Sequence, residues 1–89
     1  MFTSWGCETA KKFTINGITA ILEELDDGGD YGMVLRAKGI VACDCGKWIH
    51  FDYVPGGIDV RCGSAGVIGR ICVIGSKIDE SKIKELFGI

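Results

Sequence analysis

The stretch VLRAKGIVACDCGKWIHFDYVPGG, residues 34–57, decides the fold because it predicts two antiparallel strands joined by a tight turn. Apolar residues alternate with charged ones on both sides of residues 44–46, which is typical of half-buried strands. A three-residue turn with Gly46 in the left-handed conformation fixes the pairing of the two strands. On that register Lys38 lies opposite Asp52.

This register separates the side chains onto two faces, and a slip of one residue would exchange the faces. Gly39 falls opposite Phe51 and leaves room for its ring. The apolar face, including the strand that follows the next turn, is predicted to carry Leu35, Ala37, Val41, Ile49, Phe51, Tyr53, Ile58, Val60 and Cys62. The opposite, polar face is predicted to carry Arg36, Lys38, Trp48, His50, Asp52, Asp59 and Arg61, together with Ile40.

The rest of the chain predicts further strands and two helices. Strands are expected over residues 1–5, 31–43, 47–54, 57–62 and 70–75, and the last of these is apolar on both sides, which favours a central position. Apolar residues at helical spacing follow Thr14 as N-cap, and a second helix follows Asp79. The order indicates one α+β domain over residues 1–89, with a largely antiparallel sheet of about four to five strands and two helices on one face.

Composition excludes several classes of protein. The 89 residues carry a net charge of −2, which gives no general affinity for nucleic acid, and no apolar run is long enough to span a membrane. The start of the sequence does not have the pattern of a signal peptide. Five cysteines, an odd number, favour reduced thiols in the cytoplasm, with Cys62 and Cys72 as small core residues.

The sequence predicts no catalytic site. No P-loop occurs, and His50, the only histidine, has no evident nucleophile as a partner. Asp52 and Asp59 are expected to face each other as a pair of carboxylates would, but Lys38 and Arg61 beside them would neutralise both. A ladder of charge pairs is therefore favoured over acid–base catalysis, and the chain is not expected to be an enzyme.

A metal site at the turn is a second possibility. Cys43 and Cys45 could supply two thiolates to zinc or cobalt, although zinc normally takes three or four protein ligands. His50 lies up to about 16 Å along the strand from Cys45 and has the opposite parity from Cys43. Cys7 could join only if the first strand reaches that end of the sheet. A turn with incidental thiols is the favoured interpretation.

The polar face also allows two interpretations. It is either an ordinary solvated surface with cross-strand charge pairs, or a surface that a partner covers. Trp48 and Ile40 among the charges favour the second interpretation, since aromatic residues are enriched in contact surfaces.

Several motifs together resemble the C-terminal domain of the CobW family of GTP-binding proteins, which are related to cobalamin synthesis and metal handling. They are FTSWGCETAKKFT, YGMVLRAKGIV, GKWIHFDYVPGG and GRICVIGSKIDESKIKELF, and they span almost the whole chain. In that family a GTPase domain with a P-loop and a Cys-x-Cys-Cys motif comes first. Neither motif occurs here, and CDC at residues 43–45 is not the second one.

The resemblance implies a non-catalytic accessory domain of a cytoplasmic GTP-dependent metallochaperone. Its polar face would contact the CobW-type GTPase domain normally in the same chain, or a metalloprotein client. The alternatives are a domain that binds metal itself through Cys43 and Cys45, and a self-association module that uses exposed strand edges.

Overall fold

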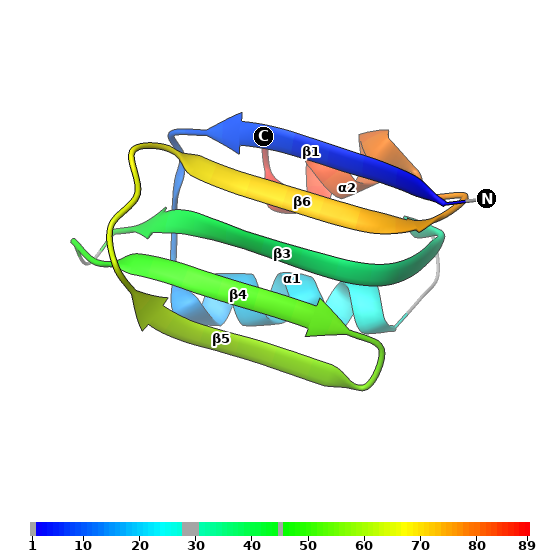
Figure 1. Cartoon of the computed structure of the whole chain (residues 1–89), viewed down its shortest axis with the longest axis horizontal. Coiled ribbons are helices and arrows are strands. Elements are labelled where there is room, and N and C mark those ends of the chain that lie inside the picture. The colour runs from blue at the N-terminus through cyan, green and yellow to red at the C-terminus, as the bar shows by residue number, and fades with distance from the viewer. Residues whose placement is uncertain (1, 28–30, 45) are drawn as a thin grey trace.

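The computed structural model describes residues 2–27, 31–44 and 46–89, and these form an α+β domain (Figure 1). The elements in chain order are β1 (Thr3–Thr9), β2 (Lys12–Phe13), α1 (Ile15–Asp26), β3 (Met33–Cys43), β4 (Trp48–Val54), β5 (Gly57–Gly63), β6 (Gly69–Ser76) and α2 (Glu80–Phe87). The predicted α+β class with a largely antiparallel sheet is confirmed.

The sheet has the strand order β1-β6-β3-β4-β5, and every neighbouring pair in that order is antiparallel. The predicted central position of residues 70–75 is confirmed, because β6 lies between β1 and β3. The short strand β2, which the sequence did not predict, pairs with the end of β3 in parallel.

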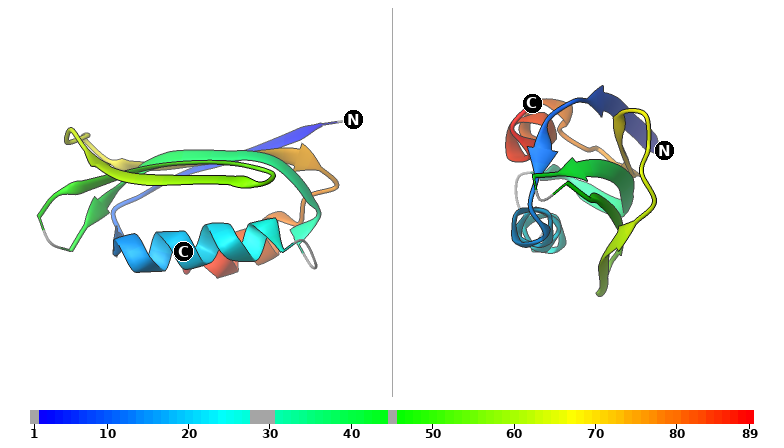
Figure 2. Two further views of the ribbon diagram at one scale, coloured as in Figure 1. Left: turned by 90° about the horizontal axis from the view of Figure 1, so that it is seen from below. Right: turned by 90° about the vertical axis from the view of Figure 1, so that its left-hand side faces the viewer.

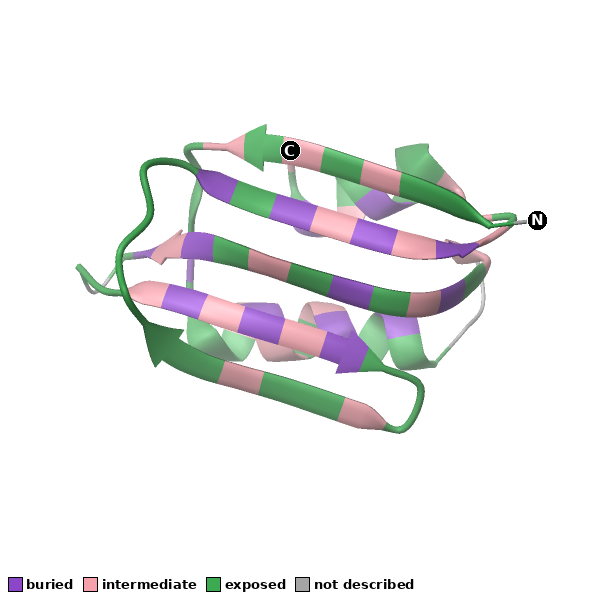
Figure 3. Ribbon diagram, in the orientation of Figure 1, coloured by how far each residue is buried: buried purple, intermediate pink, exposed green. Residues whose placement is uncertain are grey.

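Both helices lie on one face of the sheet, as predicted, and leave the other face open (Figure 2). The strands accordingly alternate between buried and more exposed residues along their length (Figure 3). The core between sheet and helices contains Ile18 and Leu22 from α1, Ile83 and Phe87 from α2, and the inward side chains of the sheet.

The predicted register of β3 and β4 is confirmed. Lys38 pairs with Asp52 and Gly39 with Phe51. A Cβ atom at Gly39 would lie 2.6 Å from Cζ of Phe51, so the ring occupies the space that the glycine leaves. Gly46 has a φ of 86°, the left-handed conformation that the turn requires. Cys45 lies outside the described residues.

One core assignment in β3 is wrong. Leu35 was predicted to be buried, but it is half-buried, and Val34 is the core residue with 5% of its surface exposed. The pairing of β3 with β6 shifts between Val34 and Arg36. Such an irregularity changes which residues face the core on its two sides, so parity counted from the turn fails beyond it.

The assignments of Ile58, Cys62 and Cys72 to the core are also wrong. Cys62 is exposed and Ile58 is 37% exposed, because β5 is an edge strand whose outer side extends beyond α1 (Figure 2). Val60 is half-buried and packs against the core. Cys72 is half-buried on the open face, since Ile71 and Val73 on either side of it point into the core.

The helix ends follow from the sequence. The hydroxyl oxygen of Thr14 accepts a hydrogen bond from the backbone N–H of Gly17 at 2.9 Å, and the Asp79 carboxylate accepts one from Lys82 at 3.1 Å. Both N-caps are as predicted. Gly88 ends α2 in the left-handed conformation. The Lys11 ammonium donates to the carbonyl oxygen of Phe87 at 3.1 Å, where a positive charge complements the helix dipole.

Tyr53 ties the β4–β5 turn to the end of α1. Its hydroxyl donates to Oδ1 of Asp26 at 2.9 Å, and the same oxygen accepts from the backbone N–H of Gly56 at 3.3 Å. Only 2% of Tyr53 is exposed. Burial, followed by the hydrogen bond and the charge of Asp26, raises the pKa of Tyr53 to about 12.

This shift predicts a loss of stability in base. The unfolded chain releases the phenol proton near pH 10, whereas the folded chain keeps it until about pH 12. In that window the unfolded state binds fewer protons, so the free energy of unfolding falls as pH rises. Urea unfolding of the wild type and Tyr53→Phe measures this slope. We expect a shallower slope in the variant, and equal slopes would contradict the account.

Candidate functional site

The seven residues predicted for the polar face lie together on the sheet face opposite the helices, which we call the open face. β3 contributes Arg36 and Lys38, β4 contributes three residues and β5 two, and the cross-strand pairing of Asp52 with Lys38 and Asp59 keeps them on one side. The full predicted set is Arg36, Lys38, Trp48, His50, Asp52, Asp59 and Arg61. This common face follows from the confirmed register, whereas a role in binding stays a prediction.

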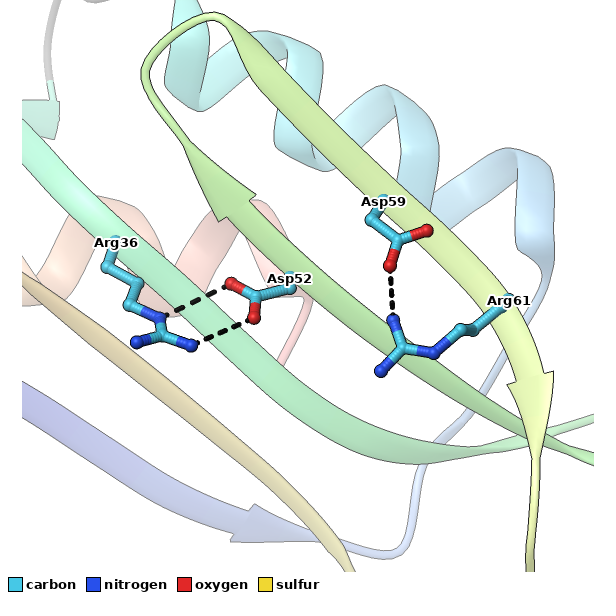
Figure 4. A network of polar contacts seen from close by, with 4 residues as sticks. All are labelled: Arg36, Asp52, Asp59 and Arg61. Carbon is cyan, nitrogen blue, oxygen red and sulfur yellow. Dashed lines mark hydrogen bonds and ion pairs between the residues drawn. The ribbon is translucent and has the colours of Figure 1, made fainter.

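The carboxylates of the open face are paired with arginines (Figure 4). Arg36 donates to both carboxylate oxygens of Asp52, at 3.4 and 2.9 Å, and Arg61 donates to Asp59 two residues away on β5. The hydrogen bond from Arg36 holds the pKa of Asp52 below its usual value. Lys38, opposite Asp52, is not its ion-pair partner, but its charge adds to the lowering of that pKa. The expected neutralisation of Asp59 by Arg61 is confirmed.

This pairing bears on catalysis. A general base needs a carboxylate positioned to take a proton, and an arginine that holds both oxygens stabilises the ionised form against that role. Asp52 and Asp59 do face each other across the strands, but each is occupied by its own arginine. These ion pairs disfavour Asp52 and Asp59 as general bases.

His50 and Trp48 support the loop that leaves β5. Nε2 of His50 lies 3.0 Å from the carbonyl oxygen of Ser64. Because a carbonyl oxygen only accepts, Nε2 carries the proton. The ring of Trp48 lies under Gly66, where an added Cβ would be 3.4 Å from the indole. These contacts hold residues 64–66 against one end of the open face.

A shallow hollow of about 830 Å³ occupies the middle of the open face. The surface is hollowed there because Gly6 of β1 has no side chain and its pairing partner on β6, Cys72, has a short one. Residues around it include Lys38, Ile40, His50, Asp52, Arg61 and Arg70. Within the described part of the chain, the Lys38 ammonium makes no hydrogen bond or ion pair, although its charge helps to lower the pKa of Asp52 opposite it.

The hollow includes residues that the sequence interpretation missed. Arg70 from β6 pairs with Glu8 from β1 at 3.2 Å on the open face, and Cys72 lies beside Lys38. The sequence contained one signal for them, since Arg70, Cys72 and Ile74 alternate with the buried Ile71 and Val73. The apolar character of residues 71–74 on both faces concealed this alternation.

The three cysteines proposed for a metal site do not form a described cluster. Cys43 is 5% exposed and points into the core, with Sγ 3.7 Å from Oδ1 of Asp44, and Cys45 lies outside the described residues. Cys7 packs against the core, and burial raises the pKa of its thiol, which disfavours the thiolate that metals bind. Across residues 2–27, 31–44 and 46–89, no three His, Cys, Asp or Glu side chains group as metal ligands.

The metal hypothesis stays a prediction, because one of its two principal ligands is not described. A cobalt(II) titration under reducing conditions tests it directly, since thiolate ligands give strong absorption with this metal. The burial of Cys43 predicts no such absorption. Absorption that disappears in the variant with Cys43→Ser and Cys45→Ser would establish the site.

No helix in the described residues has the length and apolar character needed to cross a membrane.

Residues 2–88 match the family model described as cobalamin synthesis protein cobW C-terminal domain. The fold resembles the Zn(II)-bound YjiA GTPase from E. coli, with a TM-score of 0.75 and 20% identity. A Zn(II)-bound triple mutant of the YjiA GTPase matches with the same values.

The match covers 97% of this chain but 28% of the YjiA chain, so the present chain spans less than a third of that protein's length. At 20% identity the likeness to YjiA shows the fold alone. A search of curated protein sequences found no significant match. The family model extends over nearly all 89 residues, and the chain therefore belongs to the CobW C-terminal domain family.

Proposed function

We propose that this domain is a non-catalytic accessory domain of a CobW-type, GTP-dependent metal chaperone or cobalamin-related protein. Its open face contacts a protein partner, either the GTPase domain that accompanies such domains in one chain or a metalloprotein client. The observation that carries the proposal is that Lys38, which forms no ion pair among the described residues, lies at a hollow between charges that are paired.

The charges of the open face determine which side chains a complementary partner carries. Three arginines are paired with three carboxylates, in the pairs Arg36–Asp52, Arg61–Asp59 and Arg70–Glu8. Lys38 then adds one positive charge at the centre. A complementary partner places an acidic side chain over the hollow, because opposite charges at an interface fix its orientation and disfavour wrong partners.

Apolar groups beside these charges distinguish the open face from a merely solvated one. Ile40 is 37% exposed and lines the hollow, and the half-buried Trp48 lies at one end of the open face. At the opposite end Met33 and Val54 are 65% and 48% exposed. Contact surfaces combine such apolar groups with a polar surround, so the open face offers both contact area and charge selectivity.

Reversing the charge at Lys38 tests the proposal. We expect Lys38→Glu to weaken binding of a CobW-type GTPase domain to this chain by about tenfold or more, since the partner's acid then meets a like charge. Isothermal titration with both variants measures the effect.

Lys82→Glu is the matched control, because it makes the same change of charge on α2, on the other side of the sheet. Glutamate in the first turn of a helix is well tolerated. The control should bind like the wild type. Equal weakening in both variants would show that only net charge matters, and unchanged binding of Lys38→Glu would refute the role of Lys38.

A further inference from the structure

The edge strand β5 has an exposed outer side that the fold leaves unprotected. In the described part of the chain no strand lies beyond it, and it pairs continuously with β4 over seven residues (Figure 1). Exposed edges usually carry proline, lysine or a bulge that discourages further pairing. Residues 57–63 contain neither residue, and their register with β4 has no shift. The edge is thus open to another strand.

The sequence of β5 is complementary to itself. Gly57–Gly63 reads GIDVRCG, with Val60 at its midpoint. An antiparallel copy centred on Val60 places Asp59 opposite Arg61 of the second copy, and Arg61 opposite its Asp59. Ile58 then meets Cys62, and the glycines at the two ends meet each other. Every position of the strand receives a compatible neighbour in this one register.

We infer that the β5 edge binds the β5 edge of a second copy of this chain, in antiparallel register about Val60. The result is a twofold-symmetric dimer with one continuous sheet, in which both copies use the same surface. This inference goes beyond the proposed function and does not depend on it.

On both faces of β5 the side chains are compatible with this pairing. On the open face, Asp59 and Arg61 are 64% and 54% exposed and form an ion pair within one strand (Figure 4). In the dimer they gain two further cross-strand partners of opposite charge. On the helix-covered side, the exposed Cys62 and the 37% exposed Ile58 become mutually covered.

The other edge of the sheet does not have this property. Antiparallel pairing of β1 about its midpoint, Gly6, would place Glu8 opposite Ser4 of a second copy, with no complementary charge. Glu8 is in addition already paired with Arg70 on the neighbouring strand. Self-pairing is therefore specific to the β5 edge.

Single and double charge changes test the register. Sedimentation equilibrium over a range of concentrations should show the wild type moving from the 9.6 kDa monomer toward twice that mass. Asp59→Arg and Arg61→Asp each place like charges opposite one another, and should weaken the dimer by about tenfold or more. The double variant D59R/R61D restores opposite charges in the same register and should recover the dimer.

Each alternative outcome overturns the inference. It fails if the wild type stays monomeric at about millimolar concentration, if a single variant dimerises as well as the wild type, or if the double variant does not recover. Because the test contains no GTPase domain or client, its failure leaves the proposed function untouched.

Crosslinking gives a second measurement that does not depend on charge. With Val60→Cys in a Cys62→Ser background, the two new thiols lie opposite each other across the twofold axis, within reach of a disulfide. Mild oxidation should yield a covalent dimer that Cys62→Ser alone does not form. Failure to crosslink in a folded variant would exclude pairing about Val60.

Discussion

Replacing Phe87 with alanine is expected to lower the free energy of unfolding by about 3–5 kcal/mol, the largest effect in this domain. Phe87 is 1% exposed, and its ring centroid lies 6.4 Å from those of Trp5 and Phe13 and 6.2 Å from that of Phe51. It therefore joins α2 to three separate strands. Its removal leaves a cavity between the helix and the sheet that these neighbours cannot fill without moving the backbone.

Urea unfolding followed by circular dichroism measures this loss. Glu85→Ala is the control in the same helix, because Glu85 is exposed and its replacement should change the free energy of unfolding by no more than about 0.5 kcal/mol. A loss below about 1 kcal/mol for Phe87→Ala would contradict the packing of α2 against the sheet.

Gly39→Ala is expected to have the second largest effect, about 3 kcal/mol, at the upper end of the range for overpacking. The added Cβ would lie 2.4 Å from the backbone oxygen of Arg70 and 2.6 Å from Cζ of Phe51. The phenyl ring can rotate, but the carbonyl belongs to the paired strand β6. The methyl group can be accommodated only by separating β3 from β6 at the centre of the sheet.

Gly6→Ala provides the matched control, since it adds the same methyl group to a strand glycine. Its Cβ would meet Ile71 O at 3.5 Å, an ordinary contact, and stability should change by no more than about 0.5 kcal/mol. Equal effects of the two substitutions in thermal or urea unfolding would show that Arg70 and Phe51 do not approach Gly39 as closely as in this structure.

The register of the central strands was predictable because two independent features agreed. The turn chemistry at Gly46 fixed the pairing, and the alternation of apolar residues fixed which face is buried. Gly39 opposite Phe51 supplied a third, steric indication. Local propensity and global packing pointed to one arrangement, which is the condition under which a sequence pattern is informative.

The wrong burial assignments have physical causes that cannot be read from local sequence patterns. Leu35 was placed wrongly because the pairing of β3 with β6 shifts beside it. Cys62 was placed wrongly because burial at an edge strand depends on how far the helix layer extends. Cys72 was misassigned because β6 is apolar on both faces, which hides the direction of each side chain.

For the candidate site, the sequence predicted the seven residues of the open face and the neutralisation of Asp59 by Arg61, but not the ion pair between Arg36 and Asp52. Arg36 was placed on the correct face, yet a residue directly opposite was expected to neutralise Asp52, whereas Arg36 reaches Asp52 diagonally. Arg70 and Glu8 were missed because the pairing of β1 with β6 joins opposite ends of the chain. Long-range neighbours of this kind are set by topology rather than by spacing.

We propose that the open face, and not the helix layer, contacts the partner. The most direct test is an amide chemical-shift map of the ¹⁵N-labelled chain titrated with a separately expressed GTPase domain of the CobW type. We expect the largest shifts at residues around the hollow, centred on Lys38, and expect Lys38→Glu to raise the partner concentration needed for them by about tenfold or more. Shifts confined to α1 and α2, or no shifts at saturating partner concentration, would contradict it.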